Sequence, residues 1–208
     1  MNAKPYAMTG PLRALTKAIL LTIIGIVVAG CGGGGSSSGA GTTLDSILVI
    51  GDSIGNGAGV ATPYPVRIGN ATGVPVFNDS VSGRLTDEGL AVAAGLLAAY
   101  EPSHLVVLLG TNDAGRDISN TLSNLQMIIN LGNAADATVV IGTLPPITNS
   151  PGDNARATIV SDGIRGLGGA SIADVRTAMG DGSTTIADGI HPNDLGQDII
   201  AREFLNRL

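Results

Sequence analysis

Short hydrophobic runs alternate with longer amphipathic segments along most of this chain. Runs rich in leucine and β-branched residues predict five strands, at 47–50, 74–77, 105–109, 138–141 and 171–175. The segments between and after them predict helices at 63–71, 87–100, 118–133, 154–167 and 194–208. Because the strands are apolar almost throughout, they are typical of parallel strands covered on both faces. The pattern therefore predicts an α/β fold with a five-stranded parallel sheet joined by crossover helices.

One predicted helix has a clear apolar face. In the segment 87–100, apolar residues recur at positions i, i+3, i+4 and i+7, namely Leu90, Ala93, Ala94 and Leu97. This spacing places the four side chains on one side of a helix. We expect all four to be buried.

The first 30 residues have the pattern of a secretion signal. Three basic residues precede or adjoin an apolar run at 18–30, which is too short to cross a bilayer comfortably. The run ends in Val28-Ala29-Gly30-Cys31, which resembles the bacterial lipobox. The resemblance implies that Cys31, the single cysteine of the chain, is diacylated and becomes the mature N-terminus. An ordinary cleaved signal and a marginal membrane anchor are the alternatives for residues 1–30.

The segment after the signal has no hydrophobic period. Residues 31–43 combine the lipidated Cys31 with a Gly/Ser-rich stretch, which predicts a flexible tether, and the folded domain is expected at 44–208. The predicted location is the bacterial cell envelope, on the periplasmic side of the outer membrane or on the cell surface. Gly32 after the cysteine, by the same resemblance, favours the outer membrane.

Composition and charge exclude several functions. The chain has 208 residues, 44% of them hydrophobic, which suits one compact domain that we expect to be a monomer. Beyond Cys31 there are 8 Arg and no Lys against 17 acidic residues, a difference of −9. This charge repels phosphate backbones, so we expect no nucleic-acid partner. The missing Lys excludes a P-loop and a Schiff-base mechanism.

A possible nucleophile follows the first predicted strand. The turn Gly51-Asp52-Ser53-Ile54-Gly55 consists mainly of small residues and would present the Ser53 hydroxyl at the end of that strand. Ligands of open parallel sheets bind outside the carboxyl ends of the strands. A serine needs a base that accepts its proton, and that base needs an acceptor that orients it.

Two histidines are available as the base. His104 precedes the third strand, at the opposite end of the sheet, and we expect it to be a surface or strand-start residue. His191 lies just before the last predicted helix, and Asp188 lies three positions earlier. In a loop, this spacing lets Asp188 accept from Nδ1 while Nε2 faces Ser53. The same segment also fits an Asp-Gly turn followed by a helix N-cap.

Two further polar segments follow predicted strands. Gly83 comes after the second strand and Asn112 after the third. Acyl transfer needs donors aimed at a developing oxyanion, and the backbone N–H of Gly83 and the side-chain amide of Asn112 could supply them. A turn glycine and a helix N-cap are the simpler interpretations of these residues taken singly.

Together the four segments resemble the SGNH hydrolases, also called the GDSL esterase/lipase family. The matching blocks are Gly51-Asp52-Ser53-Ile54, Val81-Ser82-Gly83, Gly110-Thr111-Asn112-Asp113 and Asp188-Gly189-Ile190-His191-Pro192-Asn193. The one departure is Ile54, where the family often has Leu, and the resemblance spans 44–208. It implies a flavodoxin-like, three-layer α/β/α sandwich with a five-stranded parallel sheet. It also implies Ser53 as nucleophile, His191 as base, Asp188 as its partner, and an oxyanion hole from Ser53, Gly83 and Asn112.

Other enzyme classes match single features only. The first block fits the G-x-S-x-G elbow of α/β-hydrolases, but that fold separates its acid and its histidine widely in sequence. The same glycines, with Asp79 beyond the second strand, faintly match a dinucleotide fingerprint, but its third glycine is replaced by Val60. No clustered zinc-ligand spacing is present, so we expect no metal and no cofactor, although incidental calcium at surface carboxylates stays open.

The sequence therefore predicts a serine esterase or lipase that hydrolyses carboxylic ester or thioester bonds through an acyl-enzyme. The expected substrates are short-chain acyl esters, lysophospholipids or acetylated glycans, at an open and shallow site without a lid domain. An O-acyltransferase with the same triad is the closest alternative. The other is a non-catalytic binding lipoprotein of the envelope.

Overall fold

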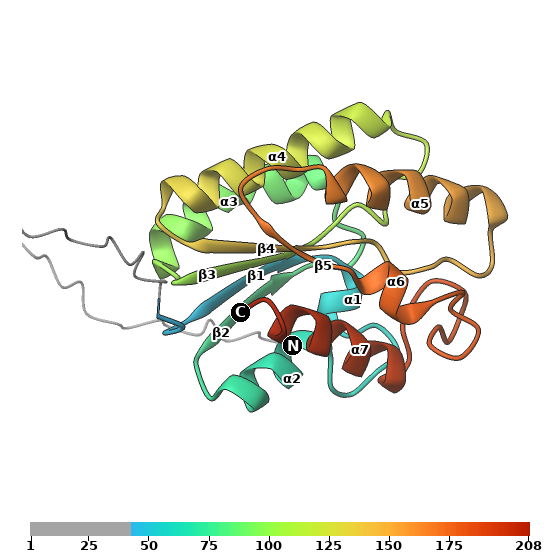
Figure 1. Cartoon of the computed structure of the whole chain (residues 1–208), viewed down its shortest axis with the longest axis horizontal. Helices are drawn as coiled ribbons and strands as arrows, with labels where there is room; N and C mark the ends of the chain where they lie inside the picture. Colours follow the sequence, from blue (N-terminus) through green and yellow to red (C-terminus); the bar gives the residue numbers. More distant parts are fainter. Residues whose placement is uncertain (1–42) are drawn as a thin grey trace, which may run out of the picture. The chain divides into compact units, whose positions relative to one another are not determined.

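The computed structural model describes residues 43–208, which contain a five-stranded, entirely parallel sheet. The strands are β1 (Ile47–Gly51), β2 (Val76–Ser80), β3 (His104–Leu108), β4 (Thr138–Gly142) and β5 (Ser171–Ala173). They lie in the order β2-β1-β3-β4-β5, and all neighbours are parallel (Figure 1). The predicted α/β class and five-stranded parallel sheet are confirmed.

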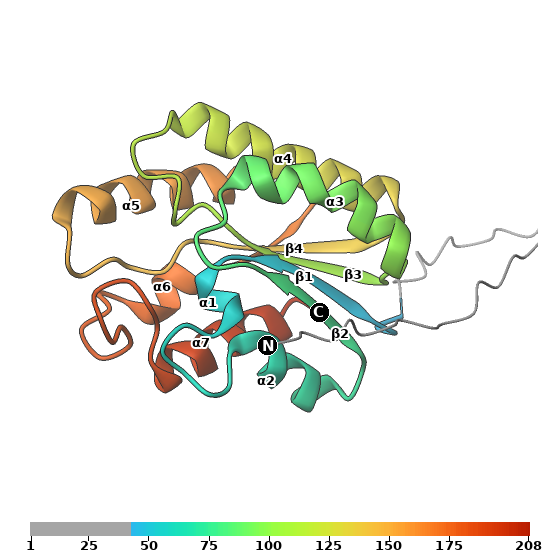
Figure 2. The same cartoon turned by 180° about the vertical axis from the view of Figure 1, so that it is seen from behind.

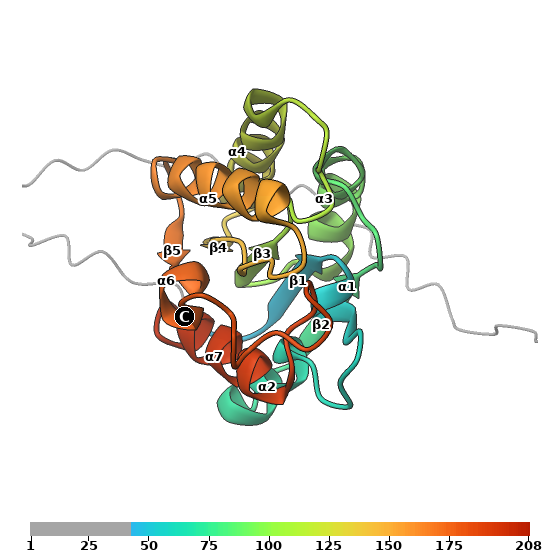
Figure 3. The ribbon, with the colours of Figure 1, turned by 90° about the vertical axis from the view of Figure 1, so that its right-hand side faces the viewer.

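Helices cover both faces of the sheet. They are α1 (Ser53–Asn56), α2 (Tyr64–Thr72), α3 (Thr86–Tyr100), α4 (Ile118–Ala134), α5 (Pro151–Arg165), α6 (Val175–Met179) and α7 (Asp194–Leu205). Figures 1 and 2 show α3, α4 and α5 above the sheet and α2, α6 and α7 below it, and the end-on view of Figure 3 separates the three layers. The α/β/α sandwich is therefore the observed architecture.

Alternating side chains of the central strands form two cores. In β1, Leu48 and Ile50 belong to the core under α3, α4 and α5, while Ile47 and Val49 belong to the core over α2, α6 and α7. All four side chains have zero exposure, as expected for a strand with helices on both faces.

Strand β2 begins two residues and ends three residues later than the predicted 74–77. The prediction missed its polar end because β2 is an edge strand, where polar side chains find partners beside the sheet. Asn78 Nδ2 donates to the Gly55 carbonyl at 3.0 Å, and Ser80 Oγ donates to Asn78 Oδ1 at 2.7 Å.

Two short helices were not predicted, and several boundaries differ. The turn expected after β1 is the single-turn helix α1, and the predicted strand at 171–175 stops at Ala173 because Asp174 caps α6. Helix α5 begins at Pro151 rather than at residue 154, since Ser150 accepts from the Asp153 N–H at 3.3 Å. Helices α1 and α6, with four and five residues, are too short to leave a periodic pattern in a sequence.

The expected apolar face of α3 is only partly right. Ala93 and Leu97 are buried and Leu90 is half-buried, but Ala94 is exposed. Its place in the interface is taken by Gly89, where an added Cβ would lie 2.5 Å from a methyl of Leu109. The helix packs through the smaller residue because the sheet comes so close at this point.

His104 is the first residue of β3, as predicted, but it is not a surface residue. It is 2% exposed at the amino end of the strand, and burial lowers the pKa of its imidazole. It therefore lies at the far end of the sheet from Ser53.

The predicted signal peptide at 1–30, Cys31 and nearly all of the tether at 31–43 lie outside the described residues. Within residues 43–208, no helix is long and apolar enough to cross a membrane.

Candidate active site

The carboxyl ends of β1, β2 and β3 bring together three of the four sequence blocks. The strand order reverses between β1 and β3, and such a reversal opens a crevice in parallel sheets. Ser53 follows β1, Gly83 follows β2 and Asn112 follows β3. The fourth block joins them from the loop that precedes α7.

Ser53 is the first residue of α1 and is 9% exposed. The side chain of Asp52 caps this helix by accepting from the Ile54 N–H at 2.9 Å. Two glycines let the turn pack against β2, because a Cβ at Gly51 or Gly55 would lie within 2.6 Å of Ser80 Oγ. The local sequence therefore fixes the serine at the end of the strand.

His191 lies between Ser53 and Asp188. Its Nε2 is 3.0 Å from Ser53 Oγ, and its Nδ1 is 2.7 Å from Asp188 Oδ2. The side chain of Asp188 is 59% exposed and that of His191 is 25% exposed. The three residues thus form one continuous hydrogen-bonded chain from the protein surface to the serine.

Asp188 also holds the loop that carries His191. Its Oδ1 accepts from the backbone N–H groups of Ile190 and His191, at 3.1 and 2.8 Å. The hydrogen bond from the His191 ring, followed by those from these N–H groups, holds the pKa of Asp188 well below its usual range. The carboxylate is therefore ionised throughout the neutral and mildly acidic pH range.

The loop between β4 and α5 holds the same segment in place. The Thr148 N–H donates to the Gly189 carbonyl at 2.8 Å. Gly189 has φ +97°, and a Cβ there would lie 2.4 Å from the Asn149 Cβ. Only glycine fits this position, which explains the Asp-Gly pair before His191.

Asn112 and Gly83 lie in the loops after β3 and β2, which contact the segment that carries Ser53. Asn112 Nδ2 donates to the Arg84 carbonyl at 3.1 Å and is 3.5 Å from Asp52 Oδ2. Gly83 is exposed with φ +80°, and its loop is tied to α1 by a 3.0 Å bond from Asn56 Nδ2 to Ser82 Oγ. The structure thus brings both predicted donors to the edge that carries Ser53.

A buried carboxylate that the sequence analysis did not single out connects these two loops. Asp113 is 1% exposed and accepts from Thr86 Oγ1 at 2.6 Å and from the Thr86 N–H at 3.2 Å. Helix α3 begins after Leu85, whose side chain has no oxygen that could cap it. Asp113 supplies that cap from another loop, so it joins the loop of Asn112 to the helix that follows Gly83.

Asp52 is the second buried carboxylate for which the sequence predicted no role. It is 1% exposed, and burial raises its pKa to about 6, while the Ile54 N–H and then the charge of His191 pull in the opposite direction. A helix N-cap just before the serine was the available signal, but its burial could not be deduced from the sequence.

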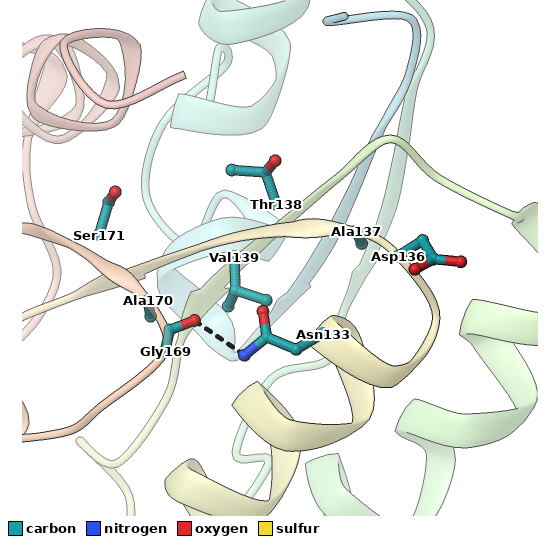
Figure 4. A pocket seen from close by; sticks show the side chains of 8 residues that line it. All are labelled: Asn133, Asp136, Ala137, Thr138, Val139, Gly169, Ala170 and Ser171. Carbon is teal, nitrogen blue, oxygen red and sulfur yellow. Dashed lines mark hydrogen bonds between the residues drawn. The ribbon is translucent and has the colours of Figure 1, made fainter. Parts of the chain in front are cut away.

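A separate pocket of the domain lies away from Ser53. It has a volume of about 420 Å³ and lies at the amino ends of β4 and β5, where Asn133 Nδ2 donates to the Gly169 carbonyl at 2.9 Å (Figure 4). It contains a single carboxylate, Asp136, and lies at the opposite end of the sheet from Ser53. Residues 43–208 contain no group of three or more His, Cys, Asp or Glu side chains that could hold a metal ion.

Comparison with protein families and solved structures agrees with this architecture. Residues 49–199 match the model of the GDSL-like lipase/acylhydrolase family, which is more than half of the chain. A comparison with curated proteins gives no match.

Solved structures share the fold at low sequence identity. A lipolytic G-D-S-L family protein from Veillonella parvula has a TM-score of 0.67 at 22% identity, over 77% of this chain and 96% of that one. The psychrotrophic esterase EstA from Pseudoalteromonas sp. gives 0.63 at 23%, over 78% and 96%. An acetylxylan esterase from Geobacillus stearothermophilus gives 0.67 at 16%, over 78% and 93%. The chain therefore belongs to the GDSL-like lipase/acylhydrolase family and is a serine ester hydrolase.

Proposed function

We propose that Ser53, His191 and Asp188 form the catalytic triad of this hydrolase. The observation that carries the proposal is the hydrogen-bonded chain of 3.0 and 2.7 Å that joins their side chains. Nucleophile, base and orienting acid need this arrangement, in this order.

In the first step, Ser53 Oγ attacks the carbonyl carbon of the ester and His191 Nε2 takes the hydroxyl proton. The imidazolium is stabilised by the ionised Asp188 and returns the proton to the leaving alcohol or thiol as the bond to the carbonyl carbon breaks. In the second step, water loses a proton to His191 and attacks the acyl-enzyme. The carboxylic acid leaves, and the proton returns to Ser53.

The negative charge of each tetrahedral intermediate needs donors on the side of the serine away from His191. We assign this role to the N–H groups of Ser53 and Gly83 and to the side-chain amide of Asn112. In the free enzyme one N–H of Asn112 donates to the Arg84 carbonyl at 3.1 Å and holds the amide in place, and the other has only a long 3.5 Å contact with Asp52 Oδ2, which an oxyanion can replace. Donors fixed before the reaction need no reorganisation when the charge develops.

Short acyl esters are the substrates that the site favours. A depression of about 330 Å³ adjoins Gly83 and is lined by Val81 and Val92 but also by Arg84 and Glu88, so it suits a small, partly polar group better than a long acyl chain. This volume lies at the small end of ligand pockets. Similar structures include an acetylxylan esterase and an esterase inhibited by monoethylphosphonate. We therefore place acetyl and other short-chain esters, acetylated glycans included, ahead of thioesters and lysophospholipids.

Hydrolysis of p-nitrophenyl acetate tests the assignment, with the acyl chain then lengthened stepwise. Ser53→Ala should abolish turnover without loss of the folded state, and Ser123→Ala, the same change at an exposed serine of α4, serves as the matched control. Turnover by Ser53→Ala at the wild-type rate would refute the assignment. Measuring free acid against acyl product in the presence of sugar acceptors separates the hydrolase from an acyltransferase. A wild-type protein that binds esters without turning them over would instead be a binding module.

We also propose that Cys31 carries a lipid that tethers the enzyme to the bacterial envelope. The lipobox-like sequence before it supports this location, and the net charge of the domain rules out attraction to anionic lipids as the reason for membrane binding. Cells fed radioactive palmitate should label the wild-type chain but not Cys31→Ser. Equal labelling of both would refute the anchor.

A further inference from the structure

Gln197, on α7, is a fully buried glutamine whose two amide atoms both have partners. It has zero exposure, its Nε2 donates to the Ile54 carbonyl at 3.1 Å, and its Oε1 accepts from the Tyr64 N–H at 2.8 Å. The partners lie 143 and 133 residues away in the sequence. A single side chain thus connects α7 with both α1 and α2.

Both partners are helix-end groups that their own helices leave unpaired. Helix α1 ends at Asn56, and the Ala58 N–H that the Ile54 carbonyl would otherwise accept from donates instead to the Ser53 carbonyl at 3.0 Å. Tyr64 is the first residue of α2, and an N–H at that position has no acceptor within its helix. A buried backbone group without a partner costs about 1–3 kcal/mol. Gln197 satisfies one such group on each helix.

The nucleophile side of this bridge lies directly beside the serine. Ile54 follows Ser53 in α1 and has zero exposure, so a shift of its carbonyl moves the serine with it. Asp52 holds the start of the helix and Gln197 holds its middle. The single turn of α1 is too short to keep its position by its own hydrogen bonds.

The α7 end of the bridge is joined to the loop that carries His191. Asn193 caps α7 by accepting from the Gly196 N–H at 3.0 Å, and its own amide donates to the Thr184 carbonyl at 2.9 Å. A Cβ at Gly196 would lie 2.4 Å from the Thr185 carbonyl oxygen, so the first turn of α7 is pressed against this loop. Gln197 therefore starts from the segment that also fixes His191.

We propose that Gln197 is a positioning residue that sets the distance between Ser53 Oγ and His191 Nε2. The inference rests on the proposed function of these two residues. A displacement of about 1 Å between reacting groups costs on the order of 100-fold in rate. Loss of the bridge should therefore lower kcat by about 10- to 100-fold and leave KM within about twofold, because Gln197 is buried and does not touch the substrate.

The test compares Gln197→Met, which keeps the length of the side chain but loses both hydrogen bonds, with Phe204→Leu. Phe204 is a buried residue of α7 that stacks on Tyr64 with ring centroids 5.5 Å apart and makes no hydrogen bond to α1. Both variants loosen α7, but only the first breaks the link to Ile54. We expect the fall in kcat for Gln197→Met alone. A kcat of Gln197→Met within twofold of wild type, or an equal fall in Phe204→Leu at matched thermal stability, would overturn the proposal.

Gln197→Asn provides a second variant if the methionine variant does not fold. It keeps a buried amide that is one methylene too short to reach both partners, and kcat should fall in the same direction. Unchanged kcat in this folded variant would also overturn the proposal.

The rate at which a fluorophosphonate labels Ser53 separates this inference from the proposed function. Labelling depends on activation of the serine by His191 and not on the choice of ester, so it should slow by the same factor as kcat in Gln197→Met. Wild-type labelling of Ser53 with equal labelling of Gln197→Met refutes the bridge alone. Absence of labelling in the wild-type protein refutes the triad itself.

Discussion

The two sides of the proposed active site are built differently. On the serine side, the carboxylates of Asp52 and Asp113 are 1% exposed and fix helix ends and loops from inside the protein. On the histidine side, Asp188 is 59% exposed and holds its own loop from outside. The proposed nucleophile Ser53 is thus positioned by the core, while the proposed base His191 lies where water and leaving groups can reach it. Substitutions on the two sides should therefore fail in different ways.

Loss of the base should have the largest effect. His191→Ala should lower kcat by about 10⁴-fold or more, because the serine then has no proton acceptor. Thermal stability should change little, since the side chain is partly exposed and belongs to neither core. Steady-state hydrolysis of p-nitrophenyl acetate with a parallel melting curve provides the measurement. A residual kcat above one tenth of wild type would exclude His191 as the base.

Loss of an oxyanion donor should come next. Asn112→Ala should lower kcat by about 10²- to 10³-fold with little change in KM, because the amide acts mainly on the charge of the intermediate. The two constants measured on one ester series decide the question. An effect confined to KM would mean that Asn112 binds the substrate in its ground state.

Removal of the buried cap should affect stability and activity together. Asp113→Ala leaves the Thr86 N–H and hydroxyl without an acceptor, which costs about 1–3 kcal/mol for each buried group, and frees the loop of Asn112. We expect a lower melting temperature and a fall in kcat of about tenfold, smaller than for Asn112→Ala because the donor itself remains.

Asp117→Ala is the matched control for that variant. Asp117 caps α4 through the Ser119 N–H at 2.7 Å, but it is exposed, so its loss should cost about 1 kcal/mol and leave kcat unchanged. If Asp117→Ala lowers kcat as much as Asp113→Ala, then Asp113 has no specific role in positioning Asn112.

The last effect concerns the pH dependence of stability and not the rate of the reaction. The pKa of Asp52 is raised from 3.8 to about 6, so the folded state holds this proton more tightly than the unfolded state does. Its contribution is complete below pH 3.8 and is lost as the pH rises through 6, by up to about 3 kcal/mol at 1.4 kcal/mol per unit. Asp52→Asn should abolish this loss, so the variant gains free energy of unfolding relative to wild type between pH 4 and 7. Urea denaturation at a series of pH values gives the free energy of unfolding of both proteins. The same pH dependence in wild type and Asp52→Asn would contradict a raised pKa for Asp52.

Much of the fold could be predicted because it depends on local patterns. The central strands β1, β3 and β4 are buried on both faces, and their apolar runs are visible in the sequence. The polar edge strand β2 was misplaced, because its side chains are satisfied by contacts outside the strand. Helix α1 contains four residues, fewer than a periodic pattern requires.

The same difference between local patterns and long-range contacts applies to the residues of the proposed site. Ser53, Asn112, Asp188 and His191 could be picked out because each stands in a short block, and the structure brings them to one edge. Asp113 and Gln197 act on backbone groups 27 to 143 residues away, and no local spacing records such contacts. Almost any residue type can supply a backbone N–H or carbonyl group, so these partners become visible only in the folded chain.

Mass spectrometry of the enzyme after reaction with a fluorophosphonate tests the central claim most directly. We expect one adduct per chain, on the peptide that contains Ser53, and no adduct in His191→Ala over the same time. An adduct on another residue, or an unmodified Ser53 in an enzyme that the reagent inactivates, would contradict that claim.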